Sequence, residues 1–268
     1  RYALLGHPVS HSWSPFIHGL FARQFGHAID YKLIDVQLGE FRKTVIDFFV
    51  GGGKGLNVTL PHKQSAAEVV NELTPRAARA GAVNTIVRRD GMQLLGDNTD
   101  GAGLVADLVG NLGLSLAGKR ILLLGAGGAV RGVLAPLLQR KPGEIRIANR
   151  SVDRAERLAG EFRELGKVTH SSFADTGGAW DLVINGTSAS LSGELPDLPA
   201  GAVGQGTVCY DMAYARGDTP FLAWATRLRA AACHKGWGML VEQAAESYLL
   251  WRGVRPATRS VIKALATA

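Results

Sequence analysis

The chain has 268 residues, of which 46% are hydrophobic, and a formal net charge of +7 at pH 7. This length and composition predict a sizeable core and favour more than one mid-sized domain. The longest apolar runs, such as residues 121–124, are far too short to span a membrane. Basic residues are scattered and aromatic residues make up only 7%, so the charge suits binding of small anions better than binding of nucleic acid.

The two cysteines indicate a reducing, cytoplasmic setting. Cys209 and Cys233 cannot form a disulfide framework, and neither belongs to a Cys-x-x-Cys pair or a cysteine/histidine cluster. Neither a structural zinc nor another bound metal is expected. The first residues are typical of a strand and show no basic segment followed by an apolar one, so no signal peptide is expected.

Strand-like and helix-like segments alternate along the first hundred residues, with glycine-rich turns between them. Strands are predicted at residues 2–6, 31–36 and 56–60, and helices at 14–25 and 40–49. Alternation of this kind is typical of an α/β fold with mostly parallel sheets.

The strand at 56–60 leads directly to a candidate acid/base. It meets Pro61, and proline favours the first turn of a helix, which places Lys63 in the opening turn. A helix N-terminus is itself partly positive, so a cation is electrostatically disfavoured there. Lys63 is therefore a candidate for proton transfer. The alternative is a surface lysine that happens to follow a strand.

A second unit is expected after Gly101. A helix at 102–112 leads to the segment 119–125, whose apolar run indicates a buried parallel strand. Further strands are expected at 144–149, 180–185 and 207–212. Apolar residues then recur with helical period from 239 to 249. This helix and the segment 256–268 are expected to pack back on the first unit, so that the chain crosses between domains twice.

A glycine-rich turn follows the strand at 119–125 and opens a helix, as in a dinucleotide site. Glycines there allow close approach of a pyrophosphate, which sits on the helix N-terminus. The match to G-x-G-x-x-G is incomplete, because Val130 stands where the third glycine belongs. Tight strand–helix turns also use glycine for purely structural reasons. The residues of the turn are Gly125, Ala126, Gly127, Gly128 and Ala129.

The end of the next strand indicates that the cofactor is NADP. An NAD site would carry an acidic residue here for the ribose hydroxyls. This chain instead has Asn149, Arg150 and Ser151, with Arg154 beyond. The two guanidinium groups can clamp a 2′-phosphate with their planar forks. The alternative is an ordinary solvated helix start with Ser151 as its N-cap.

Other polar segments fall at strand ends or helix starts. They are Ser12 and Ser14, Asn84 and Thr85, residues 97–101, and Asn185 to Ser188. Each has a structural alternative, because Asn, Asp, Ser and Thr favour turns and caps. Ser14 could cap the helix that Pro15 opens, and Asp100 could cap the helix that begins near Ala102.

Taken together, these segments resemble the shikimate dehydrogenase family. The matching runs follow the family's order over almost the whole chain: HSWSPFIH, GGGKGLNVTLPHK, AGAVNT, LLGDNTDG, LLLGAGGAVRG, ANRSVDRAE, NGTS, YDMAY and GMLVEQAAESYLLW. The resemblance implies an α/β fold of two domains with the active-site cleft between them. One is a substrate domain with a mostly parallel sheet, residues 1–101 completed by 237–268; the other is a Rossmann-like NADP-binding domain, residues 102–236.

The same resemblance implies the reaction: reversible, NADP-dependent reduction of 3-dehydroshikimate to shikimate in aromatic amino acid (chorismate) biosynthesis. Lys63 and Asp100 would be the catalytic pair. A second assignment makes Lys63 mainly an electrostatic and positioning group, with the proton passing through Asp100 or water. The chain would act as a monomer or homodimer.

The remaining site residues also come from the resemblance. The implied substrate-binding residues are Ser12, Ser14, Thr59, Lys63, Asn84, Asp100, Tyr214 and Gln243. The implied cofactor-binding residues are the turn 125–129, Asn149, Arg150, Ser151, Arg154, Thr187, Met212, Gly236 and Met239. Thr187 and Met212 would lie toward the nicotinamide.

Some positions depart from the family pattern. Trp13 stands where the family commonly carries a lysine, and His62 where an apolar or aromatic residue is usual. His62 is expected to be a neighbour of Lys63 and not the base. The residue before Gly236, often acidic in the family, is Lys235, and Trp237 follows the glycine.

Two alternatives remain open within this fold. One is a quinate/shikimate dehydrogenase, against which the presence of both Ser12 and Ser14 argues. The other is a non-catalytic NADP-binding regulator, which would be expected to lack Lys63 or Asp100.

Overall fold

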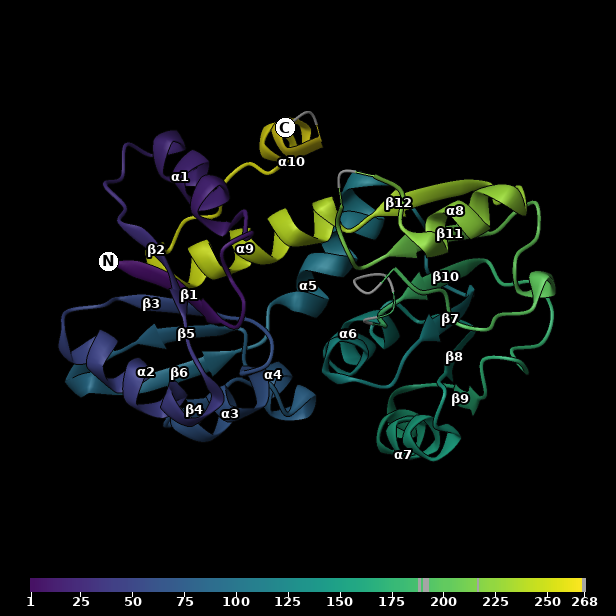
Figure 1. Cartoon of the computed structure of the whole chain (residues 1–268), viewed down its shortest axis with the longest axis horizontal. Coiled ribbons are helices and arrows are strands. Elements are labelled where there is room, and N and C mark those ends of the chain that lie inside the picture. The colour runs from purple at the N-terminus through teal and green to yellow at the C-terminus, as the bar shows by residue number, and fades with distance from the viewer. Residues whose placement is uncertain (188, 190–192, 216, 267–268) are drawn as a thin grey trace. The chain divides into compact units, whose positions relative to one another are not determined.

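Two compact units make up the fold. The computed structural model describes residues 1–187, 189, 193–215 and 217–266, so Ser188 of the NGTS motif lies outside the described residues. Unit 1 comprises Arg1–Leu104 and Leu240–Ala268, and unit 2 comprises Val105–Met239. The chain therefore passes into unit 2 after Leu104 and returns after Met239 (Figure 1).

Unit 1 contains a six-stranded sheet with the order β2-β1-β3-β5-β6-β4. Most of its pairings are parallel, as predicted, but β5 runs antiparallel to both β3 and β6. The predicted strand at 56–60 is shorter than expected. The strands are β1 (Tyr2–Gly6), β2 (Tyr31–Asp35), β3 (Gly55–Val58), β4 (Glu72–Leu73), β5 (Thr85–Arg88) and β6 (Leu94–Asp97).

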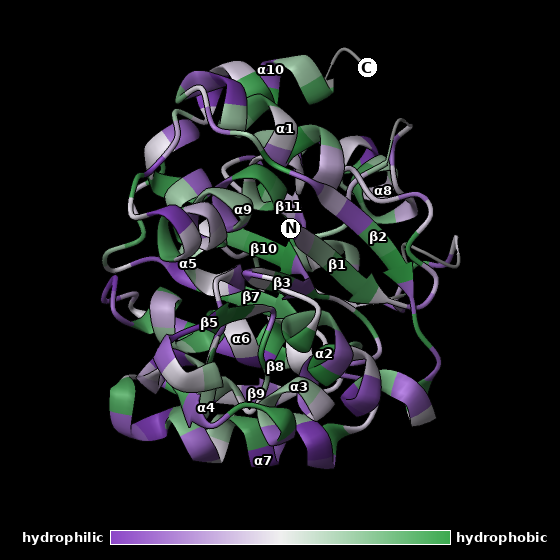
Figure 2. Ribbon diagram, turned by 90° about the vertical axis from the view of Figure 1, so that its left-hand side faces the viewer, coloured by the Kyte–Doolittle hydropathy of each residue, from purple (hydrophilic) through white to green (hydrophobic). Residues whose placement is uncertain are grey.

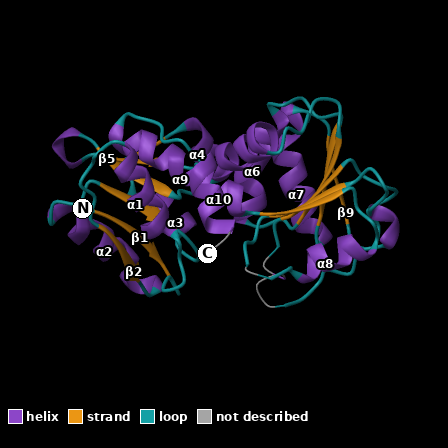
Figure 3. Ribbon diagram, turned by 90° about the horizontal axis from the view of Figure 1, so that it is seen from above, coloured by secondary structure: helices purple, strands orange, loops and turns teal. Residues whose placement is uncertain are grey.

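Helices cover both faces of this sheet (Figure 3). Along β1, Ala3 and Leu5 join the core cluster that contains Phe41 of α2. Tyr2 instead faces Trp251 of α9, with ring centroids 4.9 Å apart. Successive side chains of β1 point to opposite faces of the sheet. Because both faces are covered, β1 is buried at every position. The helices are α1 (Ser14–Gln24), α2 (Phe41–Val50), α3 (Lys63–Val69), α4 (Pro75–Ala80), α5 (Asp100–Val105), α9 (Trp237–Arg252) and α10 (Arg259–Ala266).

Unit 2 contains a second six-stranded sheet, with the order β12-β11-β10-β7-β8-β9 and every pairing parallel. The four strands predicted here are confirmed, with ends that differ by one or two residues. The strands β9 and β12 were not predicted. The strands are β7 (Arg120–Leu124), β8 (Glu144–Ala148), β9 (Val168–Ser171), β10 (Leu182–Asn185), β11 (Val208–Asp211) and β12 (Ala232–Lys235).

The helices of unit 2 are α6 (Gly128–Leu138), α7 (Val152–Phe162) and α8 (Pro220–Arg227). Helix α7 is amphipathic, because Leu158 and Phe162 are buried while its polar residues face solvent (Figure 2). Phe221 and Leu222 of α8 belong to a core cluster that includes the strand residue Val183. A parallel sheet with α-helical crossovers is the arrangement that the βαβ pattern predicted.

The helix predicted at 102–112 begins earlier and changes form. It starts at Asp100 as an α-helix and continues as a π-helix over Ala106–Asn111. Asp100 therefore lies inside the first turn of the helix and not in the loop before it.

Candidate active site

Lys63 is the first residue of α3, in the opening turn as predicted. The helix starts directly after His62, so Pro61 lies in the turn before the helix and not within it. The Nζ of Lys63 donates to Oδ2 of Asp100 at 2.6 Å, and the two side chains are only 23% and 10% exposed. The alternative of an unengaged surface lysine is therefore wrong.

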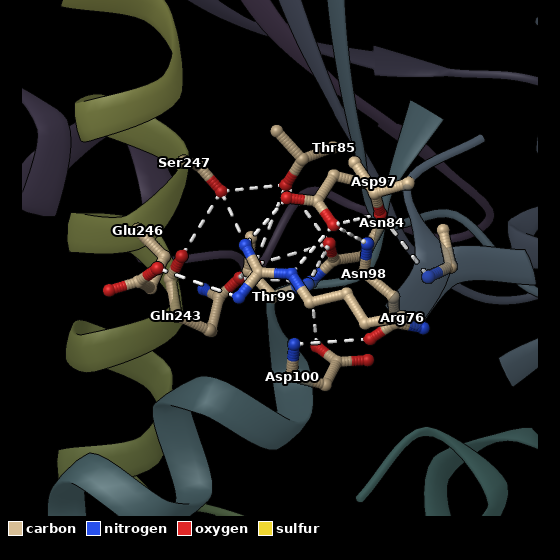
Figure 4. A network of polar contacts seen from close by, with 12 residues as sticks. Arg76, Asn84, Thr85, Asp97, Asn98, Thr99, Asp100, Gln243, Glu246 and Ser247 are labelled. Carbon is tan, nitrogen blue, oxygen red and sulfur yellow. Dashed lines mark hydrogen bonds and ion pairs between the residues drawn. The ribbon is translucent and has the colours of Figure 1, made fainter. Parts of the chain in front are cut away.

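Asp100 is held from two sides. Its Oδ2 accepts from Lys63. Its Oδ1 accepts from Nδ2 of Asn84 at 2.8 Å, a contact shown in Figure 4. Because both carboxylate oxygens bind side chains from other segments, capping does not account for this aspartate.

The amide of Asn84 is locked in one orientation. Its Oδ1 accepts from the backbone N–H of Thr99 at 2.9 Å, and the Thr99 hydroxyl donates to the same oxygen at 3.1 Å. A backbone N–H can only donate, so this side of the amide must be the oxygen. The Nδ2 of Asn84 must then face Asp100. Lys63, Asp100 and Asn84 thus form a fixed array, with donor and acceptor roles assigned by the surrounding backbone.

Helix α9 brings Gln243 to the same array. The Oε1 of Gln243 lies 3.3 Å from Nδ2 of Asn84, and its Nε2 donates to the carbonyl of Leu240 at 2.8 Å. One helical turn further on, the hydroxyl of Ser247 lies 2.7 Å from that of Thr85. Helix α9 therefore completes a buried polar network in unit 1.

Sequence reasoning missed several members of this network. Thr99 and Ser247 were not assigned roles, and neither was Asn57, whose Nδ2 donates to the Ser247 hydroxyl at 3.0 Å. Two signals were available: Thr99 lies between Asn98 and Asp100 in the DNTDG run, and Ser247 follows Gln243 by four residues on one helix face.

The two serines adjoin each other at the start of α1. The Oγ of Ser12 donates to Oγ of Ser14 at 3.1 Å and accepts from the Ser14 backbone N–H at 3.2 Å. The N-cap position is occupied by Trp13, so the suggestion that Ser14 caps the helix is wrong. Thr59 follows β3 and is half-buried, with its N–H donated to the carbonyl of Leu5 at 2.9 Å.

The glycine-rich turn in unit 2 leaves space for a ligand. Gly125 has a φ of +104°, which favours glycine. Helix α6 begins at Gly128, and a Cβ added at Gly127 or Gly128 would meet nothing within 4 Å. The backbone at this helix N-terminus is therefore open to an anion.

The missing third glycine is compensated by a glycine directly after the neighbouring strand β10. Val130 is fully buried, and a Cβ at Gly186 would lie 2.6 Å from its Cγ2 and 3.2 Å from the sulfur of Met212. The absence of a side chain at Gly186 thus makes room for the valine.

The predicted phosphate clamp is solvent-exposed. Arg150 and Arg154 are exposed, and neither guanidinium has an ion pair within the part of the chain that the structure describes. Ser151 holds the N-cap position of α7, as in the alternative of a solvated helix start, and its exposed side chain makes no capping bond. Asn149 donates its Nδ2 to the carbonyl of Ser151 at 2.9 Å.

Other residues assigned to the cofactor lie just after strands of unit 2, and one lies in α9. The hydroxyl and backbone N–H of Thr187 both donate to Oδ1 of Asn185, at 2.7 and 3.1 Å. A Cβ at Gly236 would lie 2.4 Å from the carbonyl oxygen of Met212, so these two backbones approach closely. Met239 is buried within α9.

Tyr214 belongs to unit 2, unlike the other proposed substrate-binding residues. Its ring packs against that of Trp237 with centroids 5.0 Å apart, and burial raises the pKa of its hydroxyl. Lys235, a departure from the family pattern, pairs with Asp218 at 3.1 Å.

His62 points away from the lysine–aspartate pair. Its ring is fully buried and stacks on Phe41 with centroids 4.6 Å apart, and its Nε2 lies 2.6 Å from the carbonyl oxygen of Val36. These contacts support its assignment as a neighbour of Lys63 and not as the base.

The described residues contain neither a membrane-spanning helix nor a metal-binding cluster. Within those ranges no helix is both long and apolar enough to cross a membrane, and no group of three or more His, Cys, Asp or Glu residues could hold a metal ion.

Comparison with known proteins identifies the family. Three family models match: the shikimate dehydrogenase substrate binding domain at residues 4–86, shikimate / quinate 5-dehydrogenase at 107–192, and the shikimate 5′-dehydrogenase C-terminal domain at 236–266. The chain is 55% identical over 264 residues to the shikimate dehydrogenase (NADP(+)) of Hahella chejuensis, covering 98% of this chain and 97% of that relative.

Solved structures agree with this result. The Ael1 enzyme from Pseudomonas putida has 44% identity and a TM-score of 0.94, covering 99% of this chain and 97% of that one. Shikimate 5-dehydrogenase from Thermus thermophilus, solved with NADP(H) and shikimate, has 31% identity and a TM-score of 0.87, covering 98% and 97%. Matches of this extent in both sequence and fold mean that the chain belongs to the shikimate dehydrogenase family.

Proposed function

We propose that this chain is an NADP-dependent shikimate dehydrogenase, which interconverts 3-dehydroshikimate and shikimate on the route to chorismate and the aromatic amino acids. The observation that carries the proposal is the array of Lys63, Asp100 and Asn84, in which a half-buried lysine is paired with a buried, doubly held carboxylate. Its relatives of 52–55% identity are named shikimate dehydrogenase (NADP(+)).

The array suits proton transfer at a substrate hydroxyl. When the hydroxyl becomes a ketone, its oxygen loses a proton, and in the reverse direction it gains one. Lys63 is assigned to carry this proton, because a positioned side chain within hydrogen-bond reach is what general acid–base catalysis requires. Asp100 orients the ammonium group, and Asn84 prevents the carboxylate from rotating away.

The polar groups around the array fit a substrate with several hydroxyls. Ser12, Ser14, Thr59, Asn84 and Gln243 present hydroxyl and amide groups in unit 1, and Tyr214 is assigned to the same task from unit 2. A site built from such groups discriminates strongly, because a ligand that leaves a buried donor or acceptor unpaired binds weakly.

The residues of unit 2 fit NADP. The open turn at 125–129 would hold the pyrophosphate, since no side chain obstructs Gly127 or Gly128. Arg150 and Arg154, with Asn149 and Ser151, would hold the 2′-phosphate. Thr187, Met212 and Gly236 would lie toward the nicotinamide, and Met239 would also contact the cofactor. Bound NADP supplies the hydride acceptor, and the protein supplies position and electrostatics.

We further propose that unit 1 is the substrate domain and unit 2 the cofactor domain. Both cysteines are free thiols, consistent with a cytoplasmic enzyme. It would act as a monomer or homodimer.

The decisive experiment follows absorbance of the reduced nicotinamide with shikimate or quinate, each against NADP or NAD. Reduction with shikimate and NADP alone would support the proposal in full. Comparable activity with quinate or NAD would move the assignment to a quinate/shikimate dehydrogenase. Folded protein that binds NADP but is inactive with every pair would favour a non-catalytic regulator.

A further inference from the structure

Arg76, on helix α4, is fixed by a buried carboxylate. Its Nε donates to Oδ1 of Asp97 at 2.7 Å and its Nη2 donates to Oδ2 at 2.5 Å, so the contact is bidentate. The hydroxyl of Thr74 donates to Oδ1 of the same aspartate at 2.6 Å. The Asp97 side chain is only 1% exposed. Arginine alone among the basic residues offers a planar fork that matches both oxygens of a carboxylate.

Asp97 controls the turn that carries Asp100. As the last residue of β6, it accepts the backbone N–H of Asn98 on its Oδ1 at 2.7 Å. Asn98 in turn accepts the N–H of Asp100 on its own Oδ1 at 3.2 Å and donates to the carbonyl of Ala82 at 3.1 Å. A chain of hydrogen bonds thus connects the carboxylate of Asp97 to the backbone of the proposed catalytic aspartate.

Arg76 also faces helix α9. Its Nη1 lies 3.6 Å from Oε2 of Glu246, which follows Gln243 by three residues and precedes Ser247. Glu246 is paired with Arg255 as well. Figure 4 shows the arginine between the turn at 97–100 and this helix. One side chain therefore connects the two segments that bring Asp100 and Gln243 together.

We propose that Arg76 is a positioning residue of the active site: its guanidinium holds the turn bearing Asp100 and the helix bearing Gln243 in register. This inference rests on the proposed function. Arg76 acts through Asp97 and Glu246, and no contact with substrate is assigned to it. Without it, Asp97 would keep only the Thr74 and Asn98 donors, and the turn would shift to expose the carboxylate to water.

The test compares Arg76→Gln and Arg76→Lys with the matched control Arg89→Gln. Arg89 lies in the same unit and pairs with Glu72 at 3.3 Å, but both side chains are more than half exposed. Arg76→Gln should lower kcat/KM for shikimate by about 10²-fold, the size expected from a small displacement of catalytic groups. KM for NADP should not change. Arg76→Lys should restore part of the loss, because lysine keeps the charge but not the fork. Arg89→Gln should behave like the wild type.

The proposal would be overturned by an Arg76→Gln protein that folds, melts cooperatively and keeps the wild-type kcat and KM for shikimate. Should that variant not fold, Glu246→Gln answers the same question, because it leaves the Asp97 contact intact. It should raise KM for shikimate about tenfold, and an unchanged KM would count against the inference. Wild-type protein without activity on shikimate and NADP would instead refute the proposed function.

Discussion

Replacing Lys63 with methionine tests the centre of the mechanism. Methionine keeps most of the aliphatic stem and removes the ammonium group that donates to Asp100. General acid–base catalysis contributes about 10²–10⁴ in rate, or about 3–5 kcal/mol at 1.36 kcal/mol per tenfold. We therefore expect kcat to fall by that factor.

The same substitution should also lower the free energy of unfolding, by an amount that follows from the burial of the ion pair. Removing one partner of a buried ion pair costs about 3–5 kcal/mol, because the other charge remains buried. Asp100 would keep its bond from Asn84, and the Lys63 side chain is 23% exposed, so the lower end of that range, about 3 kcal/mol, is expected.

Three measurements separate the loss of turnover from the loss of stability. They are steady-state turnover followed at the reduced-nicotinamide band, equilibrium binding of shikimate and NADP, and urea unfolding. Binding of both ligands should largely survive in Lys63→Met. Lys54→Met, at an exposed position just before β3, is the matched control and should retain full turnover. Near wild-type kcat in Lys63→Met would refute the acid/base role and favour a purely positioning lysine.

Three further predictions follow from other parts of the chain. Arg150→Ala should raise KM for NADP about 10- to 100-fold, because charged hydrogen bonds to the 2′-phosphate are lost. KM for NAD should change little. An equal rise for both cofactors would contradict the proposed phosphate clamp. Gly186→Ala should destabilise the fold by about 1–3 kcal/mol through overpacking against Val130. Adding Val130→Ala should relieve that loss, and strictly additive unfolding energies would contradict the contact. Burial alone would raise the pKa of Asp97, but the hydrogen bonds from Arg76 hold it below its usual value. Its stabilising effect is therefore present at neutral pH and lost as pH falls below about 4. Asp97→Asn should flatten that acid dependence of urea unfolding, and an unaltered slope would exclude this carboxylate as its source.

The sequence predicted the glycine turn and four of the strands of unit 2 well, because the relevant signals are local. The turn at 125–129 depends on backbone freedom at Gly125, and the choice of NADP depends on side-chain chemistry within a few residues of Arg150. The strands β4, β5 and β6 were missed. They are two to four residues long, and their pairing, partly antiparallel, leaves no periodic pattern in the sequence.

The polar network of unit 1 depended much more on tertiary contacts. Lys63 was recognisable at a helix start, but its partner Asp100 is 37 residues away and was open to interpretation as a helix cap. The orientation of Asn84 follows from a backbone donor 15 residues away. Gln243 reaches that asparagine across 159 residues, only because α9 packs on the sheet of unit 1.

The sequence by itself determined which chemical groups are available and which short segments carry them: a lysine at a helix start, an open glycine turn, and arginines where an acid would select NAD. Only the tertiary structure decided which of these groups meet, and that Arg76 and Asp97 fasten the turn beneath Asp100. Backbone preferences and capping act over a few residues, whereas a hydrogen bond between distant segments has its geometry set when their apolar faces pack.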